Sequence, residues 1–247
     1  SGDFAEDVEA GVDFLKHRHD IDPKQIGLIG HSEGGIIAPM VAARSKDIAF
    51  IVMLAGTGLN GEEILYTQGQ AILKAMGASP EMLARQKALQ QAILQGAKRE
   101  KDNKVAEKKI HEALDQLFSK FTEDERKQLE KSKGALDGQI KRVLSPWFRF
   151  YLTYDPGLAL QKVTCPVLAL IGEKDTQVTP KENLESIEKA LKAGGNKDYT
   201  VKMLPNLNHL FQSCKTGAPA EYGRIEETFA PAALETIGDW LVKHTRR

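Results

Sequence analysis

The chain has 247 residues, enough for one large domain or for one domain with an insertion. Its 34 basic and 34 acidic residues cancel, so its net charge gives no support for binding nucleic acid or an anionic membrane. Apolar runs such as residues 50–55 are far shorter than the ~20 residues that span a bilayer. Two cysteines exclude a disulfide framework and a zinc-ligand cluster, so we predict no metal and no cofactor.

The first part of the chain alternates between helix and strand patterns. Apolar residues repeat every three or four positions from Phe4 to Leu15, which predicts an amphipathic helix. Residues 25–30 and 48–55 are apolar on both faces, as in covered strands of a parallel sheet, and residues 34–45 between them predict a helix. The order helix, strand, helix, strand is typical of an α/β fold.

The composition changes after the second strand. From Leu59 to Ser145 no segment resembles a strand, and glutamine, lysine, glutamate and alanine dominate. We predict several inserted helices, so that residues 1–58 and 155–247 form two parts of one α/β core and residues 59–154 form the insertion. Acidic residues alternate with the lysines of residues 98–109, which favours a solvated helix face over a nucleic-acid site.

The α/β alternation resumes near Val163. Residues 166–172 predict a third buried strand, and Thr179-Pro180 marks the start of a helix that reaches Gly194. Residues 199–204 alternate as a fourth strand. The closing helix is predicted to bury one face, which carries Leu234, Ile237, Trp240 and Leu241.

The strongest chemical signal is Gly30-His31-Ser32-Glu33-Gly34, which fits the pattern G-x-S-x-G between a buried strand and a helix. A nucleophilic serine must project from a sharp, strained strand-to-helix turn, and glycines at Gly30 and Gly34 allow the strand and helix to approach. The amino end of the helix then lies below Ser32, where backbone N–H groups can stabilise an oxyanion.

A serine hydroxyl needs a base, and the base needs a carboxylate that orients it. Of six histidines, His209 follows the fourth strand, so it lies at the same sheet edge as Ser32. After the third strand, Glu173 and Asp175 are both candidates for the carboxylate. Asp175 is preferred because its shorter side chain lies further into the loop, and Glu173 remains the alternative.

The order Ser32, Asp175, His209 and several short segments resemble the α/β-hydrolase superfamily, especially bacterial esterases with a helical cap. The resemblance rests on residues 30–35, 145–148, 154–156, 165–175 and 208–209. It implies an α/β fold that contains the C-terminal half of the hydrolase sheet, with the insertion as an all-helical cap. It also implies that Ser32 is the nucleophile, Asp175 the acid and His209 the base, with the Glu33 N–H as one oxyanion donor.

The resemblance also reveals a departure. The family sheet has further strands, and a second oxyanion donor, ahead of the segment that resembles this chain. We therefore expect the 247 residues to belong to a longer parent protein that supplies the missing half. We also expect the segment alone to be a poor catalyst, since losing one oxyanion donor costs roughly a hundred- to thousand-fold in rate.

These features predict a serine hydrolase that cleaves small carboxylic esters through an acyl-enzyme. The same triad serves peptidases and thioesterases, and a non-catalytic binding module of this fold is a further alternative. Candidate pocket residues are His31, Trp147, Phe148 and Tyr151, and for the three aromatic residues ordinary packing is an equally good interpretation. The sequence leaves the natural substrate, the localisation and the oligomeric state open.

Overall fold

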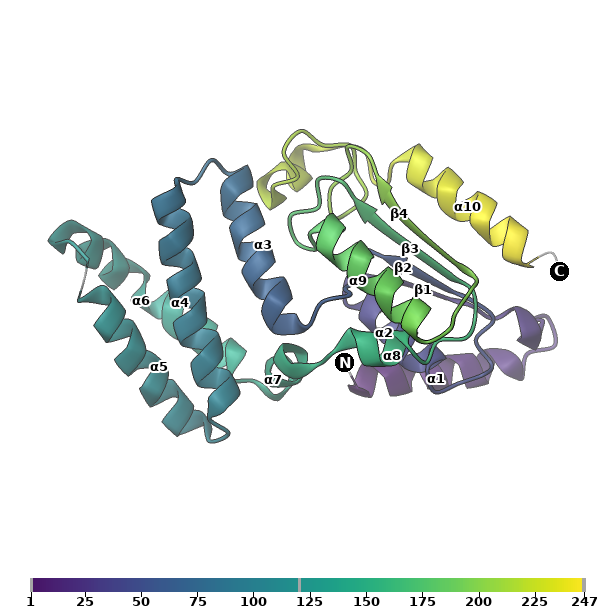
Figure 1. Cartoon of the computed structure of the whole chain (residues 1–247), viewed down its shortest axis with the longest axis horizontal. Coiled ribbons are helices and arrows are strands. Elements are labelled where there is room, and N and C mark those ends of the chain that lie inside the picture. The colour runs from purple at the N-terminus through teal and green to yellow at the C-terminus, as the bar shows by residue number, and fades with distance from the viewer. Residues whose placement is uncertain (1, 120, 246–247) are drawn as a thin grey trace. The chain divides into compact units, whose positions relative to one another are not determined.

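A computed structural model describes residues 2–119 and 121–245. The chain divides into two compact units: one contains the described residues of Ser1–Met76 and Asp155–Arg247, and the other is Gly77–Tyr154. The first unit holds a sheet with helices around it, and the second consists of helices (Figure 1).

The sheet of the first unit has four parallel strands whose spatial order follows the chain. They are β1 (Leu28–His31), β2 (Ile51–Leu54), β3 (Val167–Gly172) and β4 (Tyr199–Leu204). Strands β2, β3 and β4 lie within predicted strand segments, and β1 overlaps its predicted segment but ends one residue later, at His31. The first strand is shorter than predicted because Pro23–Gln25 forms a single 3-10 turn, η1, ahead of it.

Helices cover both faces of this sheet (Figure 1). The register pairs Val52 with Leu168 and Leu54 with Leu170. These side chains form one buried cluster with Trp240 of α10 (Pro231–Thr245). On the other face, residues of β3 and β4 pack against α9 (Pro180–Ala193), while α2 (Gly34–Ala42) contacts β1 and β2.

Four further elements belong to this unit. They are α1 (Gly2–Lys16), α3 (Gly61–Ala75), α8 (Pro156–Leu160) and the 3-10 segment η2 (Pro219–Arg224). In α1, Val12 is buried as predicted, but Phe4 is 48% exposed. In α10, Leu234 is 56% exposed and Ala233 takes the buried position instead. Both predicted apolar faces are therefore wrong at their first residue.

The second unit contains α4 (Pro80–Arg99), α5 (Asn103–Phe118), α6 (Glu123–Val143) and α7 (Pro146–Thr153). Its core is mostly aliphatic and includes Ile93, Ile110 and Leu114. Helices α4 and α5 approach so closely at Gly96 that an added Cβ would lie 2.4 Å from Ile110. No strand occurs among the described residues of this unit.

The boundary between the two units differs from the start of the predicted insertion. The compact division falls at Gly77, so α3 belongs to the first unit, whereas the sequence places residues 59–76 in the insertion.

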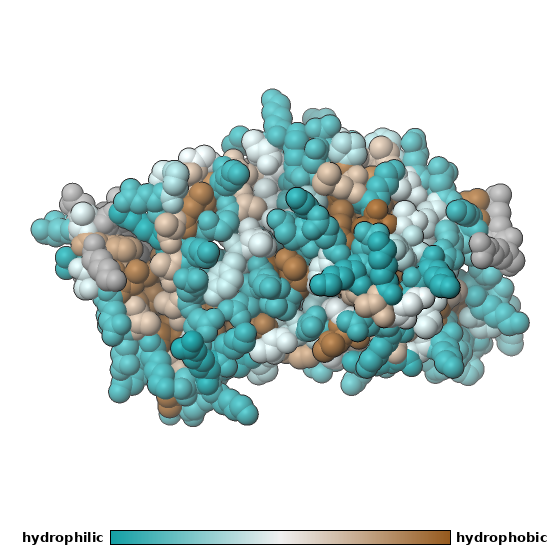
Figure 2. Space-filling view, in the orientation of Figure 1, coloured by the Kyte–Doolittle hydropathy of each residue, from teal (hydrophilic) through white to brown (hydrophobic). Residues whose placement is uncertain are grey.

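Hydrophilic side chains dominate the visible face in Figure 2, and hydrophobic ones form separate small patches. None of the helices in the described residues is long and apolar enough to cross a membrane.

Candidate active site

Ser32 lies on the turn between β1 and α2, with a positive φ of 55°. Such a backbone costs a residue other than glycine about 1–3 kcal/mol, and it persists only where the surroundings enforce it. The Ser32 N–H donates to the carbonyl of Leu54 at 2.8 Å, and the Ser32 carbonyl accepts from Gly35 N–H at 2.9 Å. The turn is therefore held on both sides of the serine.

Glycines make this turn possible, but not at both predicted positions. A Cβ added at Gly30 would lie 1.9 Å from the Gly34 carbonyl oxygen, and one at Gly35 would lie 2.6 Å from the Cα of Gly56. A Cβ at Gly34 would meet nothing within 4 Å. Close packing thus requires glycine at positions 30 and 35. The sequence predicted this requirement for Gly34, and the structure places it at Gly35 instead.

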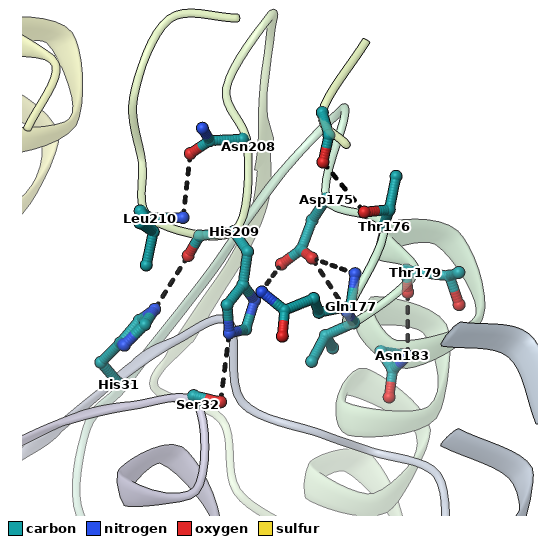
Figure 3. A network of polar contacts seen from close by, with 12 residues as sticks. His31, Ser32, Asp175, Thr176, Gln177, Thr179, Asn183, Asn208, His209 and Leu210 are labelled. Atoms are coloured by element: carbon teal, nitrogen blue, oxygen red, sulfur yellow. Dashed lines mark hydrogen bonds and ion pairs between the residues drawn. The ribbon is translucent and has the colours of Figure 1, made fainter. Parts of the chain in front are cut away.

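His209, the predicted base, lies beside Ser32 (Figure 3). Its Nε2 lies 3.1 Å from Ser32 Oγ, and its Nδ1 lies 2.8 Å from Asp175 Oδ2. An ionised carboxylate only accepts hydrogen bonds, so Nδ1 of the neutral ring carries the proton and Nε2 presents a lone pair to the serine hydroxyl. This is the tautomer in which the imidazole can remove a proton from Ser32.

Asp175 is fixed by its second oxygen. Oδ1 accepts hydrogen bonds from the backbone N–H groups of Gln177 and Val178, each at 2.8 Å. The residue is only 3% exposed. Glu173, the alternative carboxylate, is exposed and accepts instead from the Asn206 N–H at 2.9 Å. The geometry therefore favours Asp175 as the partner of His209.

The loop that carries His209 is rigidly built. Asn208 Oδ1 accepts from the N–H groups of Leu210 and Gln212 at 2.9 and 3.0 Å, and Asn208 itself is fully buried. Phe211 has a φ of 58° and is also fully buried. At the end of β3, a Cβ added to Gly172 would lie 2.3 Å from the carbonyl of Leu207, so strand and loop are in backbone contact.

A second loop covers the Asp175 turn, and the sequence analysis missed it. Thr176 Oγ1 donates to the Gly217 carbonyl at 2.9 Å, and Gln177 Nε2 donates to Tyr222 Oη at 3.0 Å. Burial raises the pKa of Tyr222, so its phenol remains protonated at neutral pH. No pattern in residues 213–224 signals this contact, because it depends on tertiary packing against the turn.

The predicted pocket residues fall into two groups. His31 lies next to the triad, where its ring centroid is 4.9 Å from that of His209. The three aromatic candidates lie in the second unit, where Trp147 and Tyr151 stack with centroids 5.6 Å apart and Phe148 is largely buried. Their place in a substrate pocket stays a prediction, as does the oxyanion role of the Glu33 N–H, although Glu33 does precede the first turn of α2.

Among the described residues, no group of three or more His, Cys, Asp or Glu side chains could hold a metal ion. Burial raises the pKa of the Cys165 thiol to about 11, so this cysteine is protonated at neutral pH and is a poor nucleophile.

Comparison with known families matches residues 6–141 to the family described as BAAT / Acyl-CoA thioester hydrolase C terminal. The match covers more than half of the chain. The chain belongs to this family. A curated relative, Esterase EstD of Thermotoga maritima, is 25% identical over 242 residues, which are 96% of this chain and 47% of the relative. The chain thus spans about half the length of the curated relative that it matches.

Solved structures identify the fold. The α/β hydrolase GrgF from Penicillium sp. sh18 is similar with a TM-score of 0.52 at 17% identity, over 98% of this chain and 72% of that one. The 2,6-dihydroxy-pseudo-oxynicotine hydrolase is similar with a TM-score of 0.50 at 15% identity, over 100% of this chain and 47% of that one. The predicted α/β-hydrolase fold is confirmed.

Proposed function

We propose that this chain carries the catalytic centre of a serine hydrolase that cleaves small carboxylic esters through an acyl-enzyme. The observation that carries the proposal is the hydrogen-bonded series Ser32 Oγ, His209 Nε2, His209 Nδ1 and Asp175 Oδ2, with contacts of 3.1 and 2.8 Å. The three side chains come from the carboxyl ends of β1, β3 and β4, which lie at one edge of the sheet.

The geometry suits acyl transfer. His209 Nε2 takes the proton of Ser32 as Oγ attacks the acyl carbonyl, and Asp175 stabilises the resulting imidazolium. The imidazolium then protonates the leaving alkoxide, which leaves Ser32 acylated. A water molecule, deprotonated by the same Nε2, releases the acid. The Glu33 N–H, at the amino end of α2, would stabilise the oxyanion in both steps.

Active-site labelling tests this proposal directly. A fluorophosphonate probe reacts only with an activated serine, so we expect the 247-residue chain to be labelled at Ser32 and the Ser32→Ala variant to remain unlabelled. Ser119→Ala, which removes an exposed hydroxyl of the second unit, is the matched control. It should be labelled like the unsubstituted 247-residue chain, which is hereafter the parent chain. Hydrolysis of p-nitrophenyl acetate should follow the same pattern. Labelling at another serine, or none at all, would favour the non-catalytic binding module.

Thioester cleavage is a second candidate, and the family match favours it. The same triad attacks esters and thioesters, because both present an acyl carbonyl to the serine. Measuring kcat/KM for p-nitrophenyl esters and acyl-CoA thioesters of equal acyl length separates the two functions. A preference for the thioester that grows with the coenzyme A moiety would assign the chain to acyl-CoA hydrolysis, and an ester preference would favour the first proposal.

A further inference from the structure

His31 contacts the candidate base from the strand that carries the nucleophile. Its Nε2 lies 2.8 Å from the backbone carbonyl oxygen of His209 (Figure 3). A carbonyl oxygen only accepts hydrogen bonds, so His31 Nε2 carries the proton and donates it. The His31 ring also meets Phe211 edge-on, with centroids 6.3 Å apart. It therefore lies against two residues of the loop that holds His209.

Two separate hydrogen bonds thus join the end of β1 to His209. One runs from Ser32 Oγ to the His209 ring, and the other runs from the His31 ring to the His209 backbone. They differ in what happens to them during catalysis. Once Ser32 is acylated, its oxygen has no hydrogen left to donate to Nε2, so the first bond is lost. The second bond involves no reacting atom and persists.

We propose that His31 is a positioning residue that holds His209 in place while Ser32 is acylated, so that Nε2 remains aligned to activate the hydrolytic water. This inference rests on the proposed function. It assigns His31 a role in deacylation, beyond the pocket role expected from its position beside the serine. The bond reaches the His209 backbone, so it fixes the residue without competing for either ring nitrogen of the base.

The charges around His31 fit a neutral donor. Partial burial lowers the pKa of His31, and the neighbouring His209 acts in the same direction, while the hydrogen bond to the His209 carbonyl and the nearby Asp175 oppose them. Glu226 and Glu227 line a cavity of about 370 Å³ that His31 also borders. At neutral pH the ring is uncharged, so it donates to the carbonyl without placing a positive charge beside the imidazolium that forms during catalysis.

Two substitutions separate the hydrogen bond from the bulk of the side chain. His31→Gln retains an N–H donor of similar reach, whereas His31→Leu fills space without a donor. In stopped-flow reactions with p-nitrophenyl acetate, we expect His31→Leu to slow deacylation by roughly 10- to 100-fold and acylation by much less, because misplacing a base by about 1 Å has effects of this size. The burst of p-nitrophenol should then become more distinct. His31→Gln should recover most of the deacylation rate.

A second measurement does not depend on turnover. In proton NMR spectra, the His209 Nδ1–H that is bound to Asp175 should give a slowly exchanging downfield signal. We expect this signal to persist in the parent chain and in His31→Gln, and to broaden in His31→Leu. A parent chain that neither turns over nor takes the fluorophosphonate label would refute the proposed function, and the NMR comparison would still decide whether His31 positions His209.

The inference fails under either of two results. In the first, His31→Leu deacylates at the parent rate with an unchanged Nδ1–H signal. In the second, His31→Gln is as impaired as His31→Leu, which would show that the donor is not the feature that matters.

Discussion

Asp175 has two tasks that its two oxygens divide between them. Oδ2 receives the His209 Nδ1–H, and Oδ1 receives the backbone N–H groups of Gln177 and Val178. An Asp175→Asn substitution keeps one oxygen, and the two backbone donors require it at the turn. The new amide group then faces His209 Nδ1 and donates to it, so the ring must carry its proton on Nε2. That tautomer cannot accept the proton of Ser32.

The two tasks predict different magnitudes for different substitutions. We expect Asp175→Asn to lower kcat by about 10⁴-fold, the size of effect that the wrong tautomer produces in a serine-protease triad, with little change in stability. Asp175→Ala removes both tasks and leaves one buried and one part-buried N–H without an acceptor. At about 1–3 kcal/mol for each lost partner, it should also lower the free energy of unfolding by about 2–6 kcal/mol.

Steady-state hydrolysis of p-nitrophenyl acetate and urea denaturation measure the two effects separately. Glu173→Gln is the matched control, because Glu173 is the neighbouring carboxylate and bonds to Asn206 rather than to the base. An Asp175→Asn variant that retains activity within tenfold of the parent would refute the orienting role. A loss of about 10⁴-fold in Glu173→Gln, as large as that expected for Asp175→Asn, would reassign the orienting role to Glu173.

Three further predictions follow from local geometry. Gly172→Ala should lower both activity and the melting temperature, because its Cβ would lie 2.3 Å from the Leu207 carbonyl oxygen. Gly11→Ala is the contrasting case, because its Cβ would meet nothing within 4 Å. It should stabilise α1 by about 0.5–1 kcal/mol, measured by urea denaturation. The pKa of His31 is lowered in the folded chain, so the unfolded chain binds a proton at this residue more readily. The free energy of unfolding should therefore fall as the pH drops below 6.5. His31→Gln should reduce this loss of stability, measured by urea denaturation between about pH 7.5 and about pH 5.5. Arg149 donates to the carbonyls of Ala97 in α4, of Glu100 just after α4, and of Leu144. Arg149→Met should therefore lower the melting temperature of the second unit, followed by circular dichroism.

The sequence was sufficient to predict that Ser32, Asp175 and His209 lie close together, and the reason is topological. Parallel strands have their carboxyl ends at one edge of the sheet, so residues that follow β1, β3 and β4 must gather there whatever their loops do. Ser32 could be recognised by its glycine-flanked turn, and His209 by its position after the fourth strand. These inferences need only the strand assignments, which apolar runs define well.

Details within the turns could not be predicted in the same way. The choice between Glu173 and Asp175 depends on which carboxylate the backbone N–H groups of the turn can reach, and spacing alone does not decide it. The requirement for Gly35 instead of Gly34 depends on the approach of Gly56, which lies on another strand's loop. The contact between His31 and the His209 carbonyl joins residues distant in sequence and leaves no local pattern.

The hydrogen bonds of the sheet explain how a strained turn can remain in place. The ladder continues beyond the strands: the N–H groups of Ser32, Ala55 and Glu173 each donate to a carbonyl of the next strand at 2.8 Å. Ser32 and Ala55 are also two of the residues with positive φ, at 55° and 50°. Each turn is therefore fixed to its neighbour at the point where the backbone leaves the sheet. Because His209 lies in the loop beyond β4 and Asp175 in the turn beyond β3, the same ladder that pairs the strands also sets the separation of Ser32, Asp175 and His209.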